Sequence, residues 1–148
     1  VYDVTYGTVR KDQDTLVVID DSIVRGTTLK ESIVRMLARL HPKNIIVVSS
    51  APQIRYPDCY GIDMSKMGDF IAFKAAVALL KDKGMASLLD KTYEAAKVEL
   101  SKSASEQRCV VQDIYAPLAD AEVSKKIAEM LKPKDLRAEF DIPEICCD

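Results

Sequence analysis

The chain has 148 residues, of which 48% are hydrophobic and 30% are charged, a composition typical of a globular protein with a buried core. Its net charge of -2 gives no electrostatic reason to expect binding to nucleic acid or to an anionic membrane. A phosphate site in this chain would therefore depend on local backbone geometry.

The four cysteines form neither a disulfide framework nor a zinc-binding pattern. Cys59, Cys109, Cys146 and Cys147 contain no C-x-x-C pair, so we interpret them as reduced thiols of a cytoplasmic protein. No stretch is apolar and long enough for a membrane span, and no signal peptide is visible. The chain begins at Val1 without a methionine, and we expect it to be a fragment of a longer protein.

The first half of the chain has the pattern of a strand, a helix and a second strand. Residues 15–19 are almost continuously apolar, which predicts a central strand buried on both faces. From residue 29 to residue 40 apolar positions recur at helical spacing, with Thr27 or Thr28 as the N-cap. A second apolar run at 45–48 predicts another strand, and two strands joined in this way should be parallel.

The second half of the chain is predicted to be mostly helical. A loop punctuated by prolines and glycine covers residues 51–64. Helical patterns follow at 69–83, 87–100 and 120–132, whereas 133–148 has no strong pattern. We therefore predict an α/β part at 1–66 and a mostly helical C-terminal extension at 67–148.

A candidate binding site follows the first strand. Ligands of open parallel sheets bind beyond the carboxyl ends of the strands, where Asp20 and Asp21 are expected. The glycine-containing turn Ser22 to Thr28 leads into a helix, and such a turn directs backbone N–H groups and hydroxyls toward a phosphate. Two carboxylates beside a phosphate cradle suit ribose hydroxyls or a hard cation such as Mg²⁺.

The same residues also fit other interpretations. An acidic pair after an apolar strand occurs in phosphoacceptor and metal-binding α/β domains, and it can simply be a solvated strand end. The pattern alone predicts a phosphate site and leaves these alternatives open.

Two blocks of sequence resemble a known family. The run Asp-Asp-Ser-Ile-Val-Arg-Gly-Thr-Thr at 20–28 resembles the loop of type I phosphoribosyltransferases that binds phosphoribosyl pyrophosphate (PRPP). The particular residues of this run resemble those of the amidophosphoribosyltransferase family of purine biosynthesis. The blocks Ser49 to Pro57 and Tyr60 to Met64 resemble the same family. The resemblance covers about residues 14–65.

The resemblance implies a fold, a reaction and a set of site residues. The fold would be the second half of a type I phosphoribosyltransferase domain, a Rossmann-like parallel sheet, followed by the helical extension. The enzyme would displace pyrophosphate from PRPP with ammonia from glutamine to give 5-phosphoribosylamine. Asp20 and Asp21 would be catalytic and would help position Mg²⁺. The implied PRPP-binding residues are Asp20, Asp21, Ser22, Ile23, Val24, Arg25, Gly26, Thr27 and Thr28.

The resemblance also implies partners. These are PRPP, purine nucleotides as feedback effectors, an N-terminal glutaminase domain and further copies of the chain in a homo-oligomer. Some relatives hold an iron–sulphur cluster through a cysteine that here is replaced by Asp58, so we predict no cluster and no structural zinc. Because the glutaminase nucleophile, the pyrophosphate loop and the lid would lie elsewhere, the isolated chain is expected to be inactive.

Two alternatives remain. Another phosphoribosyltransferase, using orotate or adenine, would share the first block but should lack the wording at 54–57 and 60–63. A non-catalytic regulator that senses PRPP or a nucleotide is the other alternative, although no basic recognition helix is evident in the sequence.

Overall fold

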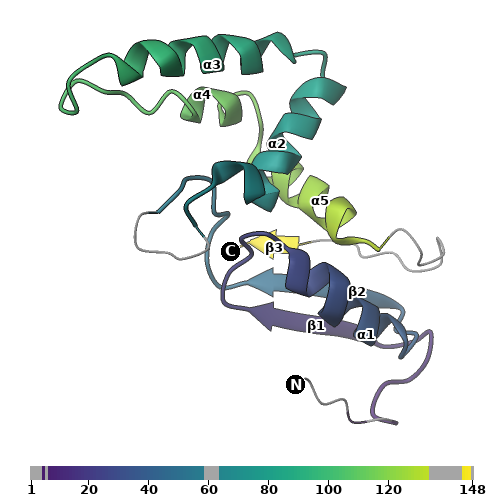
Figure 1. The fold of residues 1–148 in the computed structure, drawn as a ribbon. Coiled ribbons are helices and arrows are strands. Elements are labelled where there is room, and N and C mark those ends of the chain that lie inside the picture. The colour runs from purple at the N-terminus through teal and green to yellow at the C-terminus, as the bar shows by residue number, and fades with distance from the viewer. Residues whose placement is uncertain (1–4, 6, 59–63, 134–144, 148) are drawn as a thin grey trace.

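A computed structural model describes residues 5, 7–58, 64–133 and 145–147 of the chain (Figure 1). A small parallel sheet lies at one end, with β1 (Thr15–Asp20), β2 (Asn44–Ser49) and β3 (Ile145–Cys147) adjacent in that order. Thr15 of β1 is opposite Asn44 of β2, and Val47 of β2 is opposite Ile145 of β3. The predicted α/β class and the parallel pairing of the first two strands are confirmed.

The connection from β1 to β2 is helical, as predicted. It consists of a π-helical stretch, η1 (Leu29–Val34), which continues into α1 (Arg35–Ala38). Thr28, one of the two predicted N-cap residues, directly precedes η1, but it has helical backbone angles (φ −61°, ψ −44°) and its side chain makes no capping hydrogen bond. The helix starts earlier, because the carbonyl of Gly26 already accepts a hydrogen bond from the N–H of Lys30 at 3.0 Å.

Helices follow the 51–64 loop close to where the periodicity predicts them. After the 3-10 turn η2 (Met67–Asp69) come α2 (Ile71–Asp82), α3 (Ser87–Leu100), α4 (Gln112–Tyr115) and α5 (Asp120–Leu131). In Figure 1, α2 and α5 lie next to the sheet, whereas α3 and α4 form an arm that extends away from it. None of the helices in the described ranges is long and apolar enough to cross a bilayer.

One hydrophobic core joins the two parts of the chain. Ile45 and Val47 of β2 belong to the same buried cluster as Leu80 of α2 and Leu131 of α5. The mostly helical extension also contains a strand that the sequence does not predict, because β3 returns the chain to the sheet beside β2. The predicted division at residue 66 therefore separates two stretches of sequence that share a core.

Only one face of the sheet is covered by the part of the chain that the structure describes. Side chains alternate between the two faces of a strand, and on β2 Ile45 and Val47 are buried against the helices. On the other face of β1, Val17 is 59% exposed and Ile19 is 77% exposed. The predicted burial of β1 on both faces is thus wrong for this chain, because the described helices pack on a single side.

Candidate functional site

A pocket of about 440 Å³ opens at the carboxyl end of β1. It collects all nine residues that the sequence nominates, from Asp20 to Thr28, together with Leu29 and Ile33 of η1. The position agrees with the rule that ligands of open parallel sheets bind beyond the ends of the strands. Leu29 and Ile33 were not nominated from the sequence, since their helical spacing marks them only as core positions.

The two resembling sequence blocks are directly hydrogen-bonded to each other. The carbonyl of Asp20 accepts the N–H of Ser50 at 2.9 Å, and the carbonyl of Asp21 accepts the N–H of Ala51 at 3.0 Å. The Ser50 hydroxyl also donates to the Asp21 carbonyl at 3.1 Å. These contacts extend the β1–β2 pairing past the strand ends and fix the backbone that carries the two carboxylates.

The acidic pair folds back onto the start of the turn. Oδ1 of Asp20 accepts the N–H of Asp21 at 3.0 Å, and Oδ1 of Asp21 accepts the N–H of Ser22 at 2.8 Å. One of the amides expected to face a phosphate, that of Ser22, is therefore bonded to a carboxylate. Any amides of this turn that bind an anion would therefore come from residues after Ser22.

Partial burial, together with the neighbouring carboxyl of Asp21, raises the pKa of Asp20. Burial disfavours the charged form of a carboxyl group, and a second carboxylate at short range disfavours it further. A cation or a set of hydroxyl donors bound at this edge would offset both effects. The electrostatics of the acidic pair thus favour a ligand that carries hydroxyl groups or binds together with a cation.

The opposite end of the pocket is formed by the start of the helix. The first N–H groups of a helix have no carbonyl partner within it, and they carry the positive end of the helix dipole. Thr27 and Thr28 are exposed and Ser22 is half-buried, and all three of these hydroxyl-bearing residues line the pocket. Arg25 also lines the pocket and is exposed, so an anion here would find amides, hydroxyls and one guanidinium.

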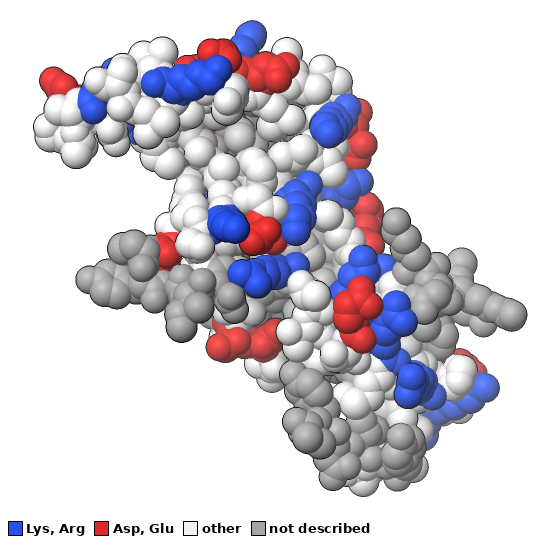
Figure 2. Space-filling view, in the orientation of Figure 1, with Lys and Arg blue, Asp and Glu red and all other residues white. Residues whose placement is uncertain are grey.

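The surrounding surface does not supply a general positive field. On the face seen in Figure 2, basic and acidic side chains are interleaved. Ion pairs such as Lys126 with Asp82 and Lys83 with Glu122 further balance the surface charge. Any anion binding in the pocket would therefore depend on its own lining groups, which are amides, hydroxyls and the side chain of Arg25.

Not every nominated residue turns its side chain to the pocket. Ile23 is only 8% exposed and belongs to the hydrophobic core, so it can offer a ligand its backbone alone. Gly26 has its Cα against Ile71 and Leu131 of the helical extension. The sequence does not reveal this, because the packing partners of Gly26 lie far away along the chain.

The residues of the acidic pair fit a magnesium ion that is also held by a ligand. Within the described ranges, no group of three or more His, Cys, Asp or Glu side chains could hold a metal by itself. Mg²⁺ is commonly bound by one or two carboxylates together with substrate phosphates and water. Asp20 and Asp21 match that donor set, and their mutual repulsion gives a dication a reason to bind there.

The loop after β2 is held by the helical extension. Arg55 forms an ion pair with Asp120 at the start of α5, and its guanidinium lies 4.9 Å from the ring centre of Tyr115. The side-chain oxygen of Gln53 accepts from Arg55 at 2.7 Å, and its amide nitrogen donates to the Ser124 hydroxyl at 2.7 Å. The polar residues of this loop thus connect elements of the fold.

Comparison with known proteins agrees with the resemblance. The amidophosphoribosyltransferase of Pasteurella multocida is 52% identical over 63 residues, which are 43% of this chain and 12% of that protein. The enzymes of Escherichia coli and Schizosaccharomyces pombe are each 47% identical, over 62 and 58 residues. Part of the chain matches amidophosphoribosyltransferase.

The match covers only part of this chain and a small part of each relative. The segment similar to amidophosphoribosyltransferases takes up 42% of this chain for the Escherichia coli protein and 39% for the Schizosaccharomyces pombe protein. It corresponds to 12% and 11% of the length of those relatives. No protein-family model matches the chain.

Proposed function

We propose that this chain is the PRPP-binding part of an amidophosphoribosyltransferase, the enzyme that makes 5-phosphoribosylamine from PRPP and glutamine in purine biosynthesis. The observation that carries the proposal is the pocket, which unites an acidic edge with an amide-and-hydroxyl end. The partial identity with amidophosphoribosyltransferases of three organisms supports the same assignment.

The phosphate of PRPP would occupy the helix end of the pocket. Backbone amides after Ser22 and the hydroxyls of Thr27 and Thr28 would donate to its oxygens. Each phosphate oxygen would then be bound by a donor of the backbone or of a short side chain, and Arg25, which also lines the pocket, would add a positive charge. This end would set the position of the ribose ring.

The ribose hydroxyls and Mg²⁺ would occupy the acidic end. Asp20 and Asp21 would accept hydrogen bonds from two hydroxyls, and their second carboxylate oxygens would help position the cation. The cation would stabilise the pyrophosphate as it leaves the anomeric carbon, and the fixed ribose would keep that carbon in line with ammonia. The carboxylates would also favour the positive charge that develops on the sugar as the bond breaks.

Other parts of the reaction would lie outside the pocket described here. A glutaminase domain would supply ammonia, a further loop would hold pyrophosphate, and purine nucleotides would act as feedback effectors. A homo-oligomer and the inactivity of this chain on its own are part of the same proposal.

The proposal is tested by titrating the chain with ribose 5-phosphate, with and without Mg²⁺, in a calorimeter. Replacing both carboxylates, Asp20→Asn with Asp21→Asn, should weaken binding at least about tenfold, since each lost charge-assisted hydrogen bond is worth about 1.5–3 kcal/mol. Asp90→Asn, the same substitution at an exposed residue of α3, is the control and should bind normally. Equal affinities for the double variant and the unaltered chain, or no binding by the folded chain, would overturn the assignment.

A second measurement addresses the reaction itself. In a complete amidophosphoribosyltransferase that contains this sequence, the same double substitution should nearly abolish the formation of phosphoribosylamine from PRPP. Basal hydrolysis of glutamine should survive, because it occurs at a separate site. Unchanged saturation by PRPP would contradict the role given to the two aspartates.

A further inference from the structure

The turn that forms the pocket has a second side, which faces the helical extension. Gly26 has a positive φ of +71°. A Cβ at this residue would lie 2.6 Å from Cδ1 of Ile71 and 2.8 Å from Cδ2 of Leu131. Real Cβ atoms do not approach other atoms this closely, so the first residue of α2 and the last residue of α5 pack directly on the backbone of the turn.

A backbone hydrogen bond reinforces this packing. The N–H of Ile71 donates to the carbonyl of Val24 at 2.8 Å. This is one of the first N–H groups of α2, which have no partner inside the helix, so the turn closes the start of α2 while α2 holds the turn. Two residues of the turn are thus bound from behind by the same residue of the extension.

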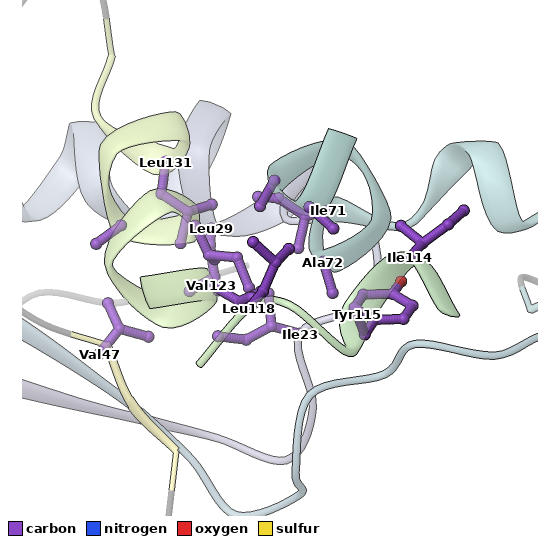
Figure 3. Packing of buried hydrophobic residues seen from close by; sticks show 14 of the residues in the cluster. Ile23, Leu29, Val47, Ile71, Ala72, Ile114, Tyr115, Leu118, Val123 and Leu131 are labelled. Atoms are coloured by element: carbon purple, nitrogen blue, oxygen red, sulfur yellow. The ribbon is translucent and has the colours of Figure 1, made fainter. Parts of the chain in front are cut away.

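The core continues this attachment. Ile23 lies between the acidic pair and Val24, and it is buried in the cluster that contains Ile71, Leu118 and Leu131 (Figure 3). All residues of the turn line the pocket, but the side chain of Ile23 and one side of Gly26 pack against the extension, whereas Thr27 and Thr28 are exposed. One side of this short turn thus lines the pocket, and the other side packs on the helical extension.

We propose that Ile71 and Leu131 are positioning residues, through which α2 and α5 hold the turn at 22–28 in its ligand-binding shape. Glycine restricts its own backbone least of all residues, so a turn containing Gly26 needs outside contacts to remain in one conformation. The packing of Ile71 and Leu131 supplies them. The part of this inference that concerns ligand affinity rests on the proposed function, whereas the coupling of the turn to the helices does not.

Coupling of this kind acts in both directions. If α2 and α5 favour the shape that binds ligand, then a bound ligand must favour the packing of α2 and α5 by the same free energy. Ribose 5-phosphate should therefore slow amide hydrogen exchange at the start of α2, which lies outside the pocket.

The test compares two leucines that are equally buried. Leu131 and Leu80 are both fully buried, but Leu80 lies nine residues along α2 from Ile71, about 14 Å along the helix axis. Leu131→Ala and Leu80→Ala remove the same atoms and should lower the melting temperature by similar amounts. Only Leu131→Ala removes a contact with Gly26.

The readout is amide hydrogen exchange in residues 22–28, measured well below both melting temperatures. Exchange in the turn should rise at least about tenfold relative to β1 in Leu131→Ala and should stay unchanged in Leu80→Ala. The affinity for ribose 5-phosphate should fall in the first variant alone. Ile71→Val, which removes only the Cδ1 methyl beside Gly26, should give a smaller effect in the same direction.

Two outcomes would overturn the inference: unaltered exchange in the turn of Leu131→Ala, or an equal rise in Leu80→Ala. The failure of the proposed function would look different. In that case the unaltered chain would not bind ribose 5-phosphate, while the exchange comparison would still report whether the helices hold the turn.

Discussion

Gly26 and Gly84 allow the stability cost of adding a Cβ to be compared between a closely packed position and an open one. Their φ angles are +71° and +72°, but a Cβ on Gly84 would meet nothing within 4 Å. Gly84→Ala should therefore cost only the strain of a left-handed residue, about 1–2 kcal/mol. Gly26→Ala should cost about 1–3 kcal/mol more, because Ile71 and Leu131 must move.

Urea unfolding of the two glycine variants gives this difference directly. Adding Leu131→Ala to Gly26→Ala should recover part of the excess, as expected for residues in contact. Equal costs at Gly26 and Gly84 would show that the contact with the extension is loose.

Asp20 should show a conflict between stability and binding. The pKa of its carboxyl is raised in the folded state by burial and by Asp21, so the folded chain holds this proton more firmly than the unfolded chain. Stability is then lost as the pH rises from the unfolded pKa through the folded pKa. Asp20→Asn, which can still accept the N–H of Asp21, should be more stable than the unaltered chain at pH 7 while binding ligand more weakly.

Thermal melting from pH 3 to pH 7 tests this sign. The advantage of Asp20→Asn should grow as the pH rises, whereas Asp90→Asn should show no such gain. An advantage that shrinks with rising pH would mean that the charged form of Asp20 is stabilised in the fold.

At the scale of elements, a single amide side chain connects the loop after β2 to α5. Gln53 accepts from Arg55 and donates to the carbonyl of Asp120 at 2.9 Å and to the hydroxyl of Ser124. Gln53→Ala leaves partly buried groups without these partners, and we expect a loss of about 1–3 kcal/mol. Gln107→Ala removes an exposed hydrogen bond of 3.2 Å and should change stability by less than about 0.5 kcal/mol. Denaturant titration of both variants is the measurement.

Elements with long, regular patterns were predictable, and those that depend on distant partners were not. The helices α2, α3 and α5 follow their apolar periodicity to within a few residues. The four-residue helix α4 is too short to show a period, although Ile114 and Tyr115 are buried against the core. The strand β3 has three residues and exists as a strand through its pairing with β2.

The sequence predicts which residues of the candidate site lie together, but it does not predict how the structure holds them. The nine residues from Asp20 to Thr28 are consecutive, so a strand, a turn and a helix suffice to gather them in one pocket. The folding back of the two carboxylates and the packing behind Gly26 depend on rotamers and on residues 71 and 131. Neither has a local signal in the sequence.

For the molecule as a whole, the two faces of the sheet should respond differently to the same change. Ile19 is 77% exposed on one face and Ile45 is 2% exposed on the other. In this chain Ile19→Thr should alter stability by less than about 0.5 kcal/mol. Ile45→Thr removes buried methyl groups and buries a hydroxyl, which should cost about 2 kcal/mol or more.

Chemical denaturation of the two isoleucine variants tests whether one face of the sheet is covered or both. A large loss for Ile19→Thr would contradict the exposure of this face of β1. A small loss for Ile45→Thr would contradict the burial of β2.

The order of strands in the sheet also has a consequence for the time course of folding. The β1–β2 pair closes a loop of roughly 30 residues, whereas β2 and β3 meet across roughly 100 residues. Closing the longer loop costs about 1 kcal/mol more in chain entropy. A strand of three residues forms few hydrogen bonds to offset that cost. The β1–β2 pair thus belongs to the early, local part of the molecule, whereas the edge strand and the contact of Leu131 with Gly26 belong to the late part. We expect a nascent chain to pair β1 with β2 first, and the turn to gain its final packing only when α5 reaches it.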